Sequence, residues 1–251
     1  MSAKRSAIVT GGSAGIGLAV ARMLAGEGWA LTLVGRAPER LAAAAAQLGD
    51  AVEVRTVSAN LADPEAAAGL GADHVAHFGG VDLLVNNAGV GLIGPIATKT
   101  PKQLDLELNL NFKSAYLLLQ ACVPALIESA AERGASYVVN VSSLAARENP
   151  PNGSTYASMK AALVSLSNVA HAELSRHGVH VTALLPGLVD TPGTAWAGEG
   201  LRDTMMTADD VAEAVRFLLR TSARCYVPEI MLTTAGPGVW HSPVDWDAVA
   251  T

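Results

Sequence analysis

Short apolar segments alternate with longer segments of helical pattern along the 251 residues of this chain. These segments consist mostly of apolar residues, as at 30–34, 81–85 and 179–185, rather than of strict alternations of apolar and polar residues. Strands that are covered by helices on both faces have this composition, because neither side of the strand meets water. The pattern therefore predicts an α/β fold with a parallel sheet between two layers of helices, and the length is compatible with a single domain over residues 1–251.

A glycine-rich turn follows the first apolar run at residues 7–10, with the spacing Thr10-Gly11-x-x-x-Gly15-x-Gly17. A helical pattern begins directly after this turn. Glycine lets the backbone approach a ligand closely, and the first turn of a helix offers free N–H groups and a partial positive charge. Three glycines alone also occur in ordinary turns, but the strand before and the helix after them favour a site for the pyrophosphate of a dinucleotide.

The end of the second apolar run bears on which dinucleotide binds. A site for NAD usually has a carboxylate there for the ribose 2′-hydroxyl, but this chain has Gly35 followed by Arg36, with Arg40 one helical turn later. A guanidinium can bind a 2′-phosphate through two charge-assisted hydrogen bonds. We therefore predict NADP as the cofactor and keep NAD as the alternative, in which Arg36 stacks on the adenine or is solvated.

A second segment with chemical potential begins where the apolar run 137–141 meets Ser142 and Ser143. A loop with prolines and a glycine follows, and then a long helical pattern that carries Tyr156 and Lys160. Residues four apart lie on the same face of a helix, so the phenol and the ammonium point in one direction. This spacing is common on helix surfaces, and it gains meaning only together with the rest of the chain.

These motifs together resemble the classical short-chain dehydrogenase/reductase family, over about residues 6 to 235. They occur in the family's order: Thr10-Gly11-x-x-x-Gly15-x-Gly17, Asn86-Asn87-Ala88-Gly89, Asn111, Ser143, Tyr156-x-x-x-Lys160 and Pro186-Gly187. The resemblance implies a single Rossmann-type domain with a doubly wound sheet of about seven strands. It also implies a homodimer or homotetramer that assembles through helices.

The resemblance assigns catalytic roles to four residues of this chain: Asn111, Ser143, Tyr156 and Lys160. Tyr156 is implied as the general acid in reduction and the general base in oxidation, and Ser143 as the hydrogen-bond donor to the substrate oxygen. Lys160 and an oxidised nicotinamide are expected to lower the pKa of Tyr156, and Lys160 to bind the nicotinamide ribose. Asn111 is implied to hold a water molecule for a proton relay.

The glycine turn and the resemblance together define the expected cofactor contacts. They are Thr10, Gly11, Ser13, Gly15, Ile16, Gly17, Arg36, Asn60, Leu61, Asn87, Ala88, Gly89, Tyr156, Lys160, Pro186, Gly187, Val189 and Thr191. Asn60 departs from the family, which more often has an aspartate there to contact the adenine. Asn60 still has an acceptor oxygen for the same contact.

The substrate end is expected in residues 190–206, where the family has a mobile lid and this chain is rich in small residues. Its larger apolar residues indicate a moderately apolar small-molecule substrate: Trp196, Leu201, Met205 and Met206. Arg147 and Glu148 either flank the same pocket or are solvated. The tail at 236–251 contains Trp240 and Trp246, which suggest that it docks on this chain or on a partner.

Other classes of function are not favoured. A net charge of −6 without a basic cluster argues against nucleic acid. Neither a signal-peptide core nor 18 uninterrupted apolar residues are present, so we expect a cytoplasmic protein without a membrane span. No metal site is expected, because Cys122 and Cys225 are far apart and His74 and His77 have only Asp73 beside them.

The sequence therefore predicts an NADP(H)-dependent oxidoreductase that interconverts a carbonyl and a secondary alcohol by hydride transfer, with Tyr156 as the acid and base. Three alternatives stay open. The first is a reductase of imines or activated alkenes on the same fold, and the second is an NAD(H)-dependent alcohol dehydrogenase. The third is a non-catalytic nucleotide-binding regulator, which the presence of both Tyr156 and Lys160 disfavours.

Overall fold

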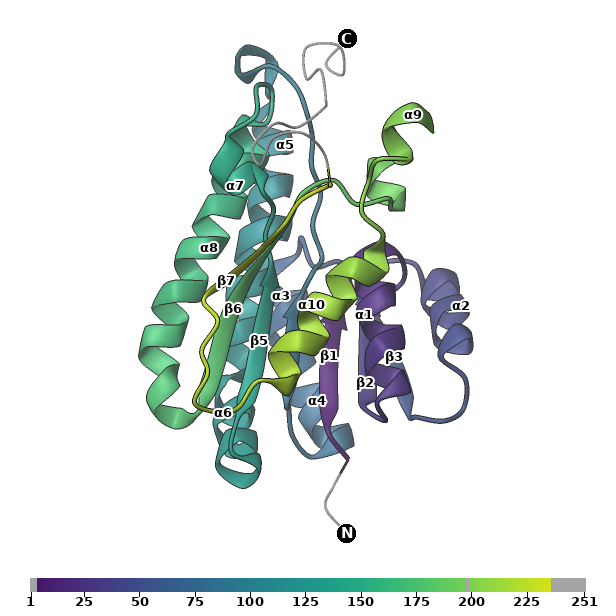
Figure 1. Cartoon of the computed structure of the whole chain (residues 1–251), viewed down its shortest axis with the longest axis vertical. Coiled ribbons are helices and arrows are strands. Elements are labelled where there is room, and N and C mark those ends of the chain that lie inside the picture. The colour runs from purple at the N-terminus through teal and green to yellow at the C-terminus, as the bar shows by residue number, and fades with distance from the viewer. Residues whose placement is uncertain (1–3, 197–198, 236–251) are drawn as a thin grey trace.

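The computed structural model describes residues 4–196 and 199–235, so the tail with Trp240 and Trp246 lies outside the described residues. Its centre is a parallel sheet with the strand order β3-β2-β1-β4-β5-β6-β7 (Figure 1). The strands are β1 (Ser6–Thr10), β2 (Ala30–Gly35), β3 (Val54–Ser58), β4 (Leu83–Asn86), β5 (Ser136–Val141), β6 (Val179–Pro186) and β7 (Glu229–Leu232). The predicted doubly wound, seven-stranded parallel sheet is confirmed.

Helices cover both faces of this sheet (Figure 1). One face is covered by α1 (Gly15–Gly26), α2 (Pro38–Leu48) and α10 (Ala208–Arg220). The other is covered by α4 (Leu70–Phe78), α6 (Ser114–Arg133) and α8 (Ser154–Leu174). Shorter helices connect these layers: α3 (Pro64–Ala68), α5 (Pro101–Leu108), α7 (Ala145–Glu148) and α9 (Glu199–Arg202).

The two faces of β1 belong to different hydrophobic cores, which explains why its residues are apolar on both sides. In β1, Ala7 and Val9 pack into the core under α1 and α10, whereas Ile8 packs into the core under α6. All three side chains are fully buried. Burying one aliphatic side chain of this kind contributes about 1.5–3 kcal/mol, so a polar residue on either side of the strand would be costly.

The long helical segment Pro101–Arg133 is interrupted. Helix α5 leads through a π-helical turn, η2 (Asn109–Lys113), into α6, which contains Pro124. Together, residues Pro101–Arg133 form a helix that is long and apolar enough to cross a membrane by length and composition. Half of its most apolar 18-residue window is buried inside the protein, as in a core helix that packs against a sheet.

His74 on α4 lies in the core and is fully buried. Its Nδ1 lies 2.7 Å from the hydroxyl oxygen of Thr32, and its Nε2 lies 3.1 Å from that of Ser6. Burial lowers the pKa of His74 from 6.5 to about 4, and the positive charges of Arg55 and His77 act in the same direction. The neutral imidazole is therefore part of the folded state, where it links β1, β2 and α4.

We predict that this imidazole makes the fold sensitive to mild acid. Because the folded pKa lies below the unfolded value, the contribution of neutral His74 is complete above pH 6.5 and is lost as the pH falls from 6.5 to about 4. The full effect is about 3 kcal/mol. It should appear in urea unfolding measured from pH 4 to 8, and it should disappear in His74→Gln.

His77→Gln is the matched control, since His77 lies on the same helix but pairs with Glu53 at the surface. It should keep the acid-dependent loss of the wild-type protein. An unchanged pH profile in His74→Gln would contradict the assignment.

Candidate active site

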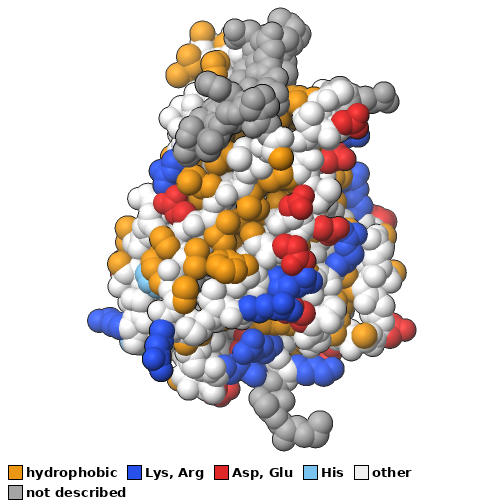
Figure 2. Space-filling model, in the orientation of Figure 1, with side chains coloured by type: hydrophobic (Ala, Val, Ile, Leu, Met, Phe, Trp, Pro, Cys, Tyr) orange, Lys and Arg blue, Asp and Glu red, His pale blue; other side chains and the backbone are white. Residues whose placement is uncertain are grey.

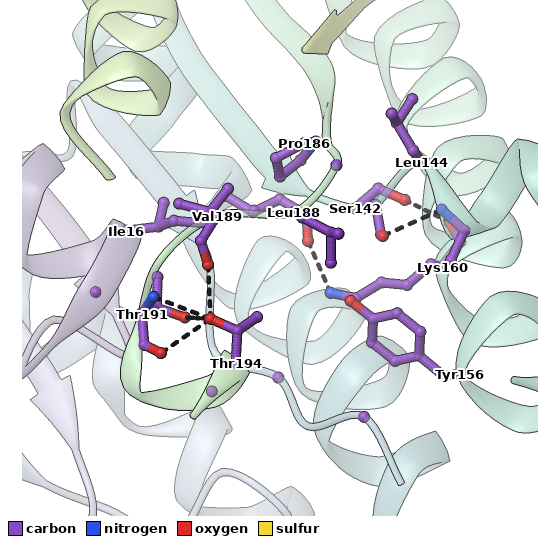
Figure 3. A pocket seen from close by; sticks show the side chains of 18 of the residues that line it. Ile16, Ser142, Leu144, Tyr156, Lys160, Pro186, Leu188, Val189, Thr191 and Thr194 are labelled. Carbon is purple, nitrogen blue, oxygen red and sulfur yellow. Dashed lines mark hydrogen bonds between the residues drawn. The ribbon is translucent and has the colours of Figure 1, made fainter. Parts of the chain in front are cut away.

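A cavity of about 450 Å³ opens at the carboxyl ends of the strands, where the strand order reverses between β1 and β4 (Figure 3). Ligands bind at such reversal points in open α/β sheets, and the volume suits a small molecule. Many of the predicted site residues line it: Gly11, Gly15, Ile16, Asn87, Ala88, Gly89, Ser143, Tyr156, Lys160, Pro186, Gly187, Val189 and Thr191. The structure thus brings the dinucleotide turn and the Tyr156 helix to opposite sides of one space.

The remaining predicted residues do not line this cavity. Thr10, Gly17 and Asn111 are buried behind its wall, and Leu61 is buried farther along the sheet. Ser13, Arg36 and Asn60 lie outside it, where Arg36 and Asn60 are exposed at the ends of β2 and β3. The expected adenosine end is therefore an open surface, whereas the expected nicotinamide end is enclosed.

The glycines of the first turn are required by its backbone. Gly11 and Gly15 have φ angles of +65° and +53°, which side chains with a Cβ rarely adopt. A Cβ on Gly17 would lie 2.3 Å from the carbonyl oxygen of Gly11, so the start of α1 packs directly on the turn. This close approach exposes the backbone of the turn toward the cavity.

The first turn of α1 fits a dinucleotide pyrophosphate. Its N-cap residue is Ala14, which has no side-chain oxygen, and among the described residues no side chain caps the helix and no acid lies in its first turn. The N–H groups and the positive end of the helix are thus available for an anion. We conclude that the residues present fit a dinucleotide cofactor.

Thr10 joins the two loops that border the cavity. Its hydroxyl oxygen accepts hydrogen bonds from the backbone N–H groups of Asn87 and Ala88, at 2.9 and 3.0 Å. The Asn87 amide donates to the carbonyl oxygen of Thr10 at 2.9 Å. These bonds hold the loop after β4 against the glycine turn after β1.

Tyr156 and Lys160 lie together on the other side of the cavity (Figure 3). Ser143 lines the cavity as well. The side chain of Ser143 acts on Tyr156 and favours a lower pKa of the phenol, and its hydroxyl oxygen accepts from the N–H of Ala145 at 3.1 Å. Lys160 is 4% exposed, its Nζ donates to the carbonyl oxygen of Val141 at 2.8 Å, and burial lowers its pKa to about 8. Ser142 has a structural role, because its hydroxyl donates to the carbonyl oxygen of Lys160.

The predicted lowering of the Tyr156 pKa concerns the protein with a bound oxidised nicotinamide and stays a prediction. Burial raises this pKa, the side chain of Ser143 opposes the rise, and the charge of Glu107 adds to it. The Lys160 Nζ lies 5.7 Å from the centre of the Tyr156 ring and is bound to a backbone carbonyl. A positively charged nicotinamide, which the prediction also invoked, is not part of this balance.

Asn111 lies in the π-helical turn, with its side chain directed to the loop after β4. Its Nδ2 donates to the carbonyl oxygen of Val90 at 2.8 Å, and its Oδ1 accepts from the N–H of Val90 at 2.9 Å. This amide therefore positions the loop that lines the cavity. The role of Asn111 in holding a water molecule stays a prediction.

The expected substrate segment after β6 is only partly at the cavity. Trp196 and Thr194 line it, but Met205 and Met206 do not, and Leu201 is likewise absent from its lining. Met206 instead forms a β-bridge with Val189 and packs on the core. Residues 197–198 of this segment lie outside the described residues.

The two charged residues after Ser143 separate in the structure. Arg147 turns to β7, where its Nη2 lies 2.7 and 2.8 Å from the carboxylate oxygens of Glu229. Glu148 lines the cavity. Glu148 thus flanks the pocket, whereas Arg147 forms an ion pair with Glu229 outside it.

Several lining residues were not predicted from the sequence. They lie in the loop after β4 and after the last strand: Val90, Gly91, Ile93, Thr233 and Thr234. A usable signal existed, because loops that follow parallel strands all emerge at the same edge of a sheet.

A dinucleotide turn at the reversal point and a hydroxyl–phenol–ammonium group across the cavity define the class of Rossmann-type oxidoreductases. The family model described as short chain dehydrogenase matches residues 5–201. The chain therefore belongs to the short-chain dehydrogenase/reductase family.

Individual proteins agree with this assignment. An oxidoreductase of Staphylococcus epidermidis is 33% identical over 233 residues, which are 91% of this chain and 96% of that protein. An alcohol dehydrogenase of Thermococcus sibiricus, in complex with 5-hydroxy-NADP, has a TM-score of 0.85 and 29% identity over 96% of this chain and 99% of its own. A 3-ketoacyl-(acyl-carrier-protein) reductase of Brucella melitensis, in complex with NADH, has a TM-score of 0.83 and 27% identity, covering 91% and 96%.

Gly89→Ala should impair turnover without unfolding the protein. The new Cβ would lie 2.6 Å from the Asn111 Oδ1 and 3.3 Å from the Lys160 Nζ, so both groups must move. A displacement of about 1 Å in such a site can lower the rate roughly 100-fold. The test compares kcat for carbonyl reduction, followed by nicotinamide absorbance, with the circular dichroism of the variant.

Gly94→Ala is the matched control in the same loop, because a Cβ there has nothing within 4 Å. It should retain most of the activity. Equal activity in both variants would show that the packing around Gly89 does not matter for catalysis.

Proposed function

We propose that the protein is an NADP(H)-dependent oxidoreductase that interconverts a carbonyl and a secondary alcohol, with Tyr156 as the acid and base. The observation that carries the proposal is the placement of Ser143, Tyr156 and Lys160 together on one side of the space bordered by the glycine turn. The relatives support it, since one is an alcohol dehydrogenase and another reduces a ketoacyl group by its name.

The nicotinamide, when bound, supplies or accepts the hydride. Pro186, Gly187 and Val189 line the end of the cavity where it is expected. Ser143 donates a hydrogen bond to the substrate oxygen, where negative charge develops in the transition state. Tyr156 transfers its phenolic proton to that oxygen in reduction and takes it back in oxidation.

Lys160 is suited to bind ribose hydroxyls, because its Nζ has further donor positions beside the bond to Val141. Burial favours the protonated phenol of Tyr156, which is the form that acts as an acid. Reduction is accordingly expected to persist through neutral pH and to fall when Tyr156 loses its proton at high pH.

Tyr156→Phe should lower kcat by about 10²- to 10⁴-fold, the usual contribution of general acid–base catalysis. Cofactor affinity, measured by thermal shift with NADPH, should change little, because the phenyl ring still fills the same space. Tyr116→Phe is the control, since Tyr116 is 44% exposed on α6. Undiminished turnover in Tyr156→Phe would refute the mechanism.

The preference for NADP rests on the end of β2. Gly35 offers no carboxylate, Arg36 is exposed there, and Ser58 donates a hydrogen bond to the carbonyl oxygen of Arg36 at 3.0 Å. The Ser13 hydroxyl lies 3.4 Å from the position that a Cβ of residue 35 would take, so the glycine turn adjoins this corner. Together they form a surface suited to a ribose 2′-phosphate.

Arg36→Ala should weaken the binding of NADPH by about 10- to 100-fold, as expected for the loss of charge-assisted hydrogen bonds. NADH binding should change little, which makes it the internal control. The NADPH affinity of Arg36→Lys should lie between those of the wild-type protein and Arg36→Ala. Lysine keeps the positive charge but cannot form the two parallel hydrogen bonds of a guanidinium. Tighter binding of NADH than of NADPH by the wild-type protein would contradict the preference.

The NADH complex of the ketoacyl reductase keeps NAD(H) as a second candidate cofactor. A carbonyl, imine and activated-alkene panel with both cofactors separates the alternatives by which substrate is consumed.

We also propose self-association of this chain. Figure 2 shows hydrophobic side chains on the face of α10 and β7, where Phe217 and Met231 are about half exposed.

A further inference from the structure

A buried ion pair lies beside the Tyr156 helix. Glu107, in the last turn of α5, has no exposed surface, and its carboxylate lies 3.5 Å from the Nζ of Lys99, whose side chain is 7% exposed. The remaining oxygen capacity of Glu107 is used as well: one oxygen accepts from the N–H of Leu92 at 2.8 Å, and the other accepts from the hydroxyl of Thr155. The Lys99 Nζ donates to the carbonyl oxygen of Leu92.

Two charges at such a position are costly for folding alone. Replacing a buried ion pair by apolar residues of similar volume is often neutral or stabilising, so stability does not account for this one. The pair is placed where three segments meet: the loop after β4 at Leu92, helix α5, and the first turn of α8 at Thr155. Thr155 directly precedes Tyr156.

The ion pair also holds a loop that lines the cavity. The loop that Leu92 anchors supplies the lining residues Val90, Gly91 and Ile93 on either side of it. Asn111, one turn after Glu107, binds the same loop at Val90. The loop is thus held at two backbone positions by polar side chains from one helix.

The charge of Glu107 reaches the Tyr156 hydroxyl and raises its pKa, in the same direction as burial. The other ionisable groups near Tyr156 are Lys160 on its own helix and Glu148 from α7, which lines the same cavity. Other charged residues of α5 and the π-helical turn are exposed: Lys102, Asp105 and Lys113. Glu107 is hydrogen-bonded to the helix of Tyr156 through the hydroxyl of Thr155.

We propose that Glu107 is a positioning residue for Tyr156, with Lys99 as its counter-ion and Thr155 as its link to helix α8. The two charges of the ion pair set the electrostatic potential at the phenol, and the hydrogen bond to Thr155 sets the position of the phenol. The inference rests on the proposed role of Tyr156 as acid and base. It differs from a purely structural role, in which only the packing of the three segments would matter.

The test measures the ionisation of Tyr156 directly. The phenolate absorbance of the full-length protein is titrated with pH, and the signal of Tyr156 is obtained by subtracting the matching Tyr156→Phe protein, since the chain has 4 tyrosines. This readout needs no substrate and no turnover. A failure of the proposed function therefore leaves it valid, and circular dichroism at each pH confirms that the protein is folded.

Removing either charge should move the pKa of Tyr156 in opposite directions. Glu107→Gln removes the negative charge and should lower the pKa by roughly half a pH unit or more, and Lys99→Met removes the positive charge and should raise it. The double variant should lie near the wild-type value. Shifts of the same sign in both single variants, or no shift in either, would overturn the electrostatic part.

Thr155→Val separates position from charge, because it removes the hydrogen bond and leaves the ion pair. It should lower kcat by about threefold or more while the pKa of Tyr156 moves less than in Glu107→Gln, and Thr155→Ser should restore the rate. Wild-type kcat in Thr155→Val, or a rate that Thr155→Ser fails to restore, would overturn the positional part.

Discussion

The hydrogen bonds between Thr10 and the loop after β4 are the constraint on which the rest of the site depends. The connections after β1 and β4 leave toward opposite faces of the sheet, just beyond the paired residues Val9 and Val85. One threonine hydroxyl accepts from two backbone N–H groups and lies 3.2 Å from the carbonyl oxygen of Val85. The distance between the dinucleotide turn and the loop that continues to Val90 is thereby set by hydrogen bonds of the sheet itself.

Polar side chains of one helix connect this loop to the Tyr156 side of the cavity. Asn111 holds Val90, and Glu107 holds Leu92 and Thr155, so α5 and its π-helical turn connect the loop to the start of α8. The same helix that fills a core therefore also positions the groups that would move a proton. Burial makes these contacts consequential, because the low polarity that lowers the pKa of Lys160 and raises that of Tyr156 also strengthens the hydrogen bonds around them.

The features that the sequence predicted well are those whose physical cause is local. Mostly apolar strand segments follow from burial on both faces of a strand, and the glycines of the first turn follow from positive φ angles and a close approach. The features that could not be predicted concern partners that are distant in sequence. Glu107 meets Leu92 and Thr155, 15 and 48 residues away, and on sequence alone it is one more acid in a helix. Met206 could not be separated from a lining residue, because its bridge to Val189 is tertiary, and the direction of the Tyr156 pKa depends on a burial that no spacing reveals.

The π-helical turn at Asn109–Lys113 has a consequence for the register of the whole segment. A π turn is an α-helix with one additional residue, and each residue of a helix advances by roughly 100°. Deleting a single residue there would restore a regular helix and rotate α5 by about that angle relative to α6. Glu107 would then turn away from Leu92 and Thr155, while the core contacts of α6 could remain as they are. One inserted residue thus lets a single helix present two faces that a regular helix could not, one to the core and one to the candidate active site.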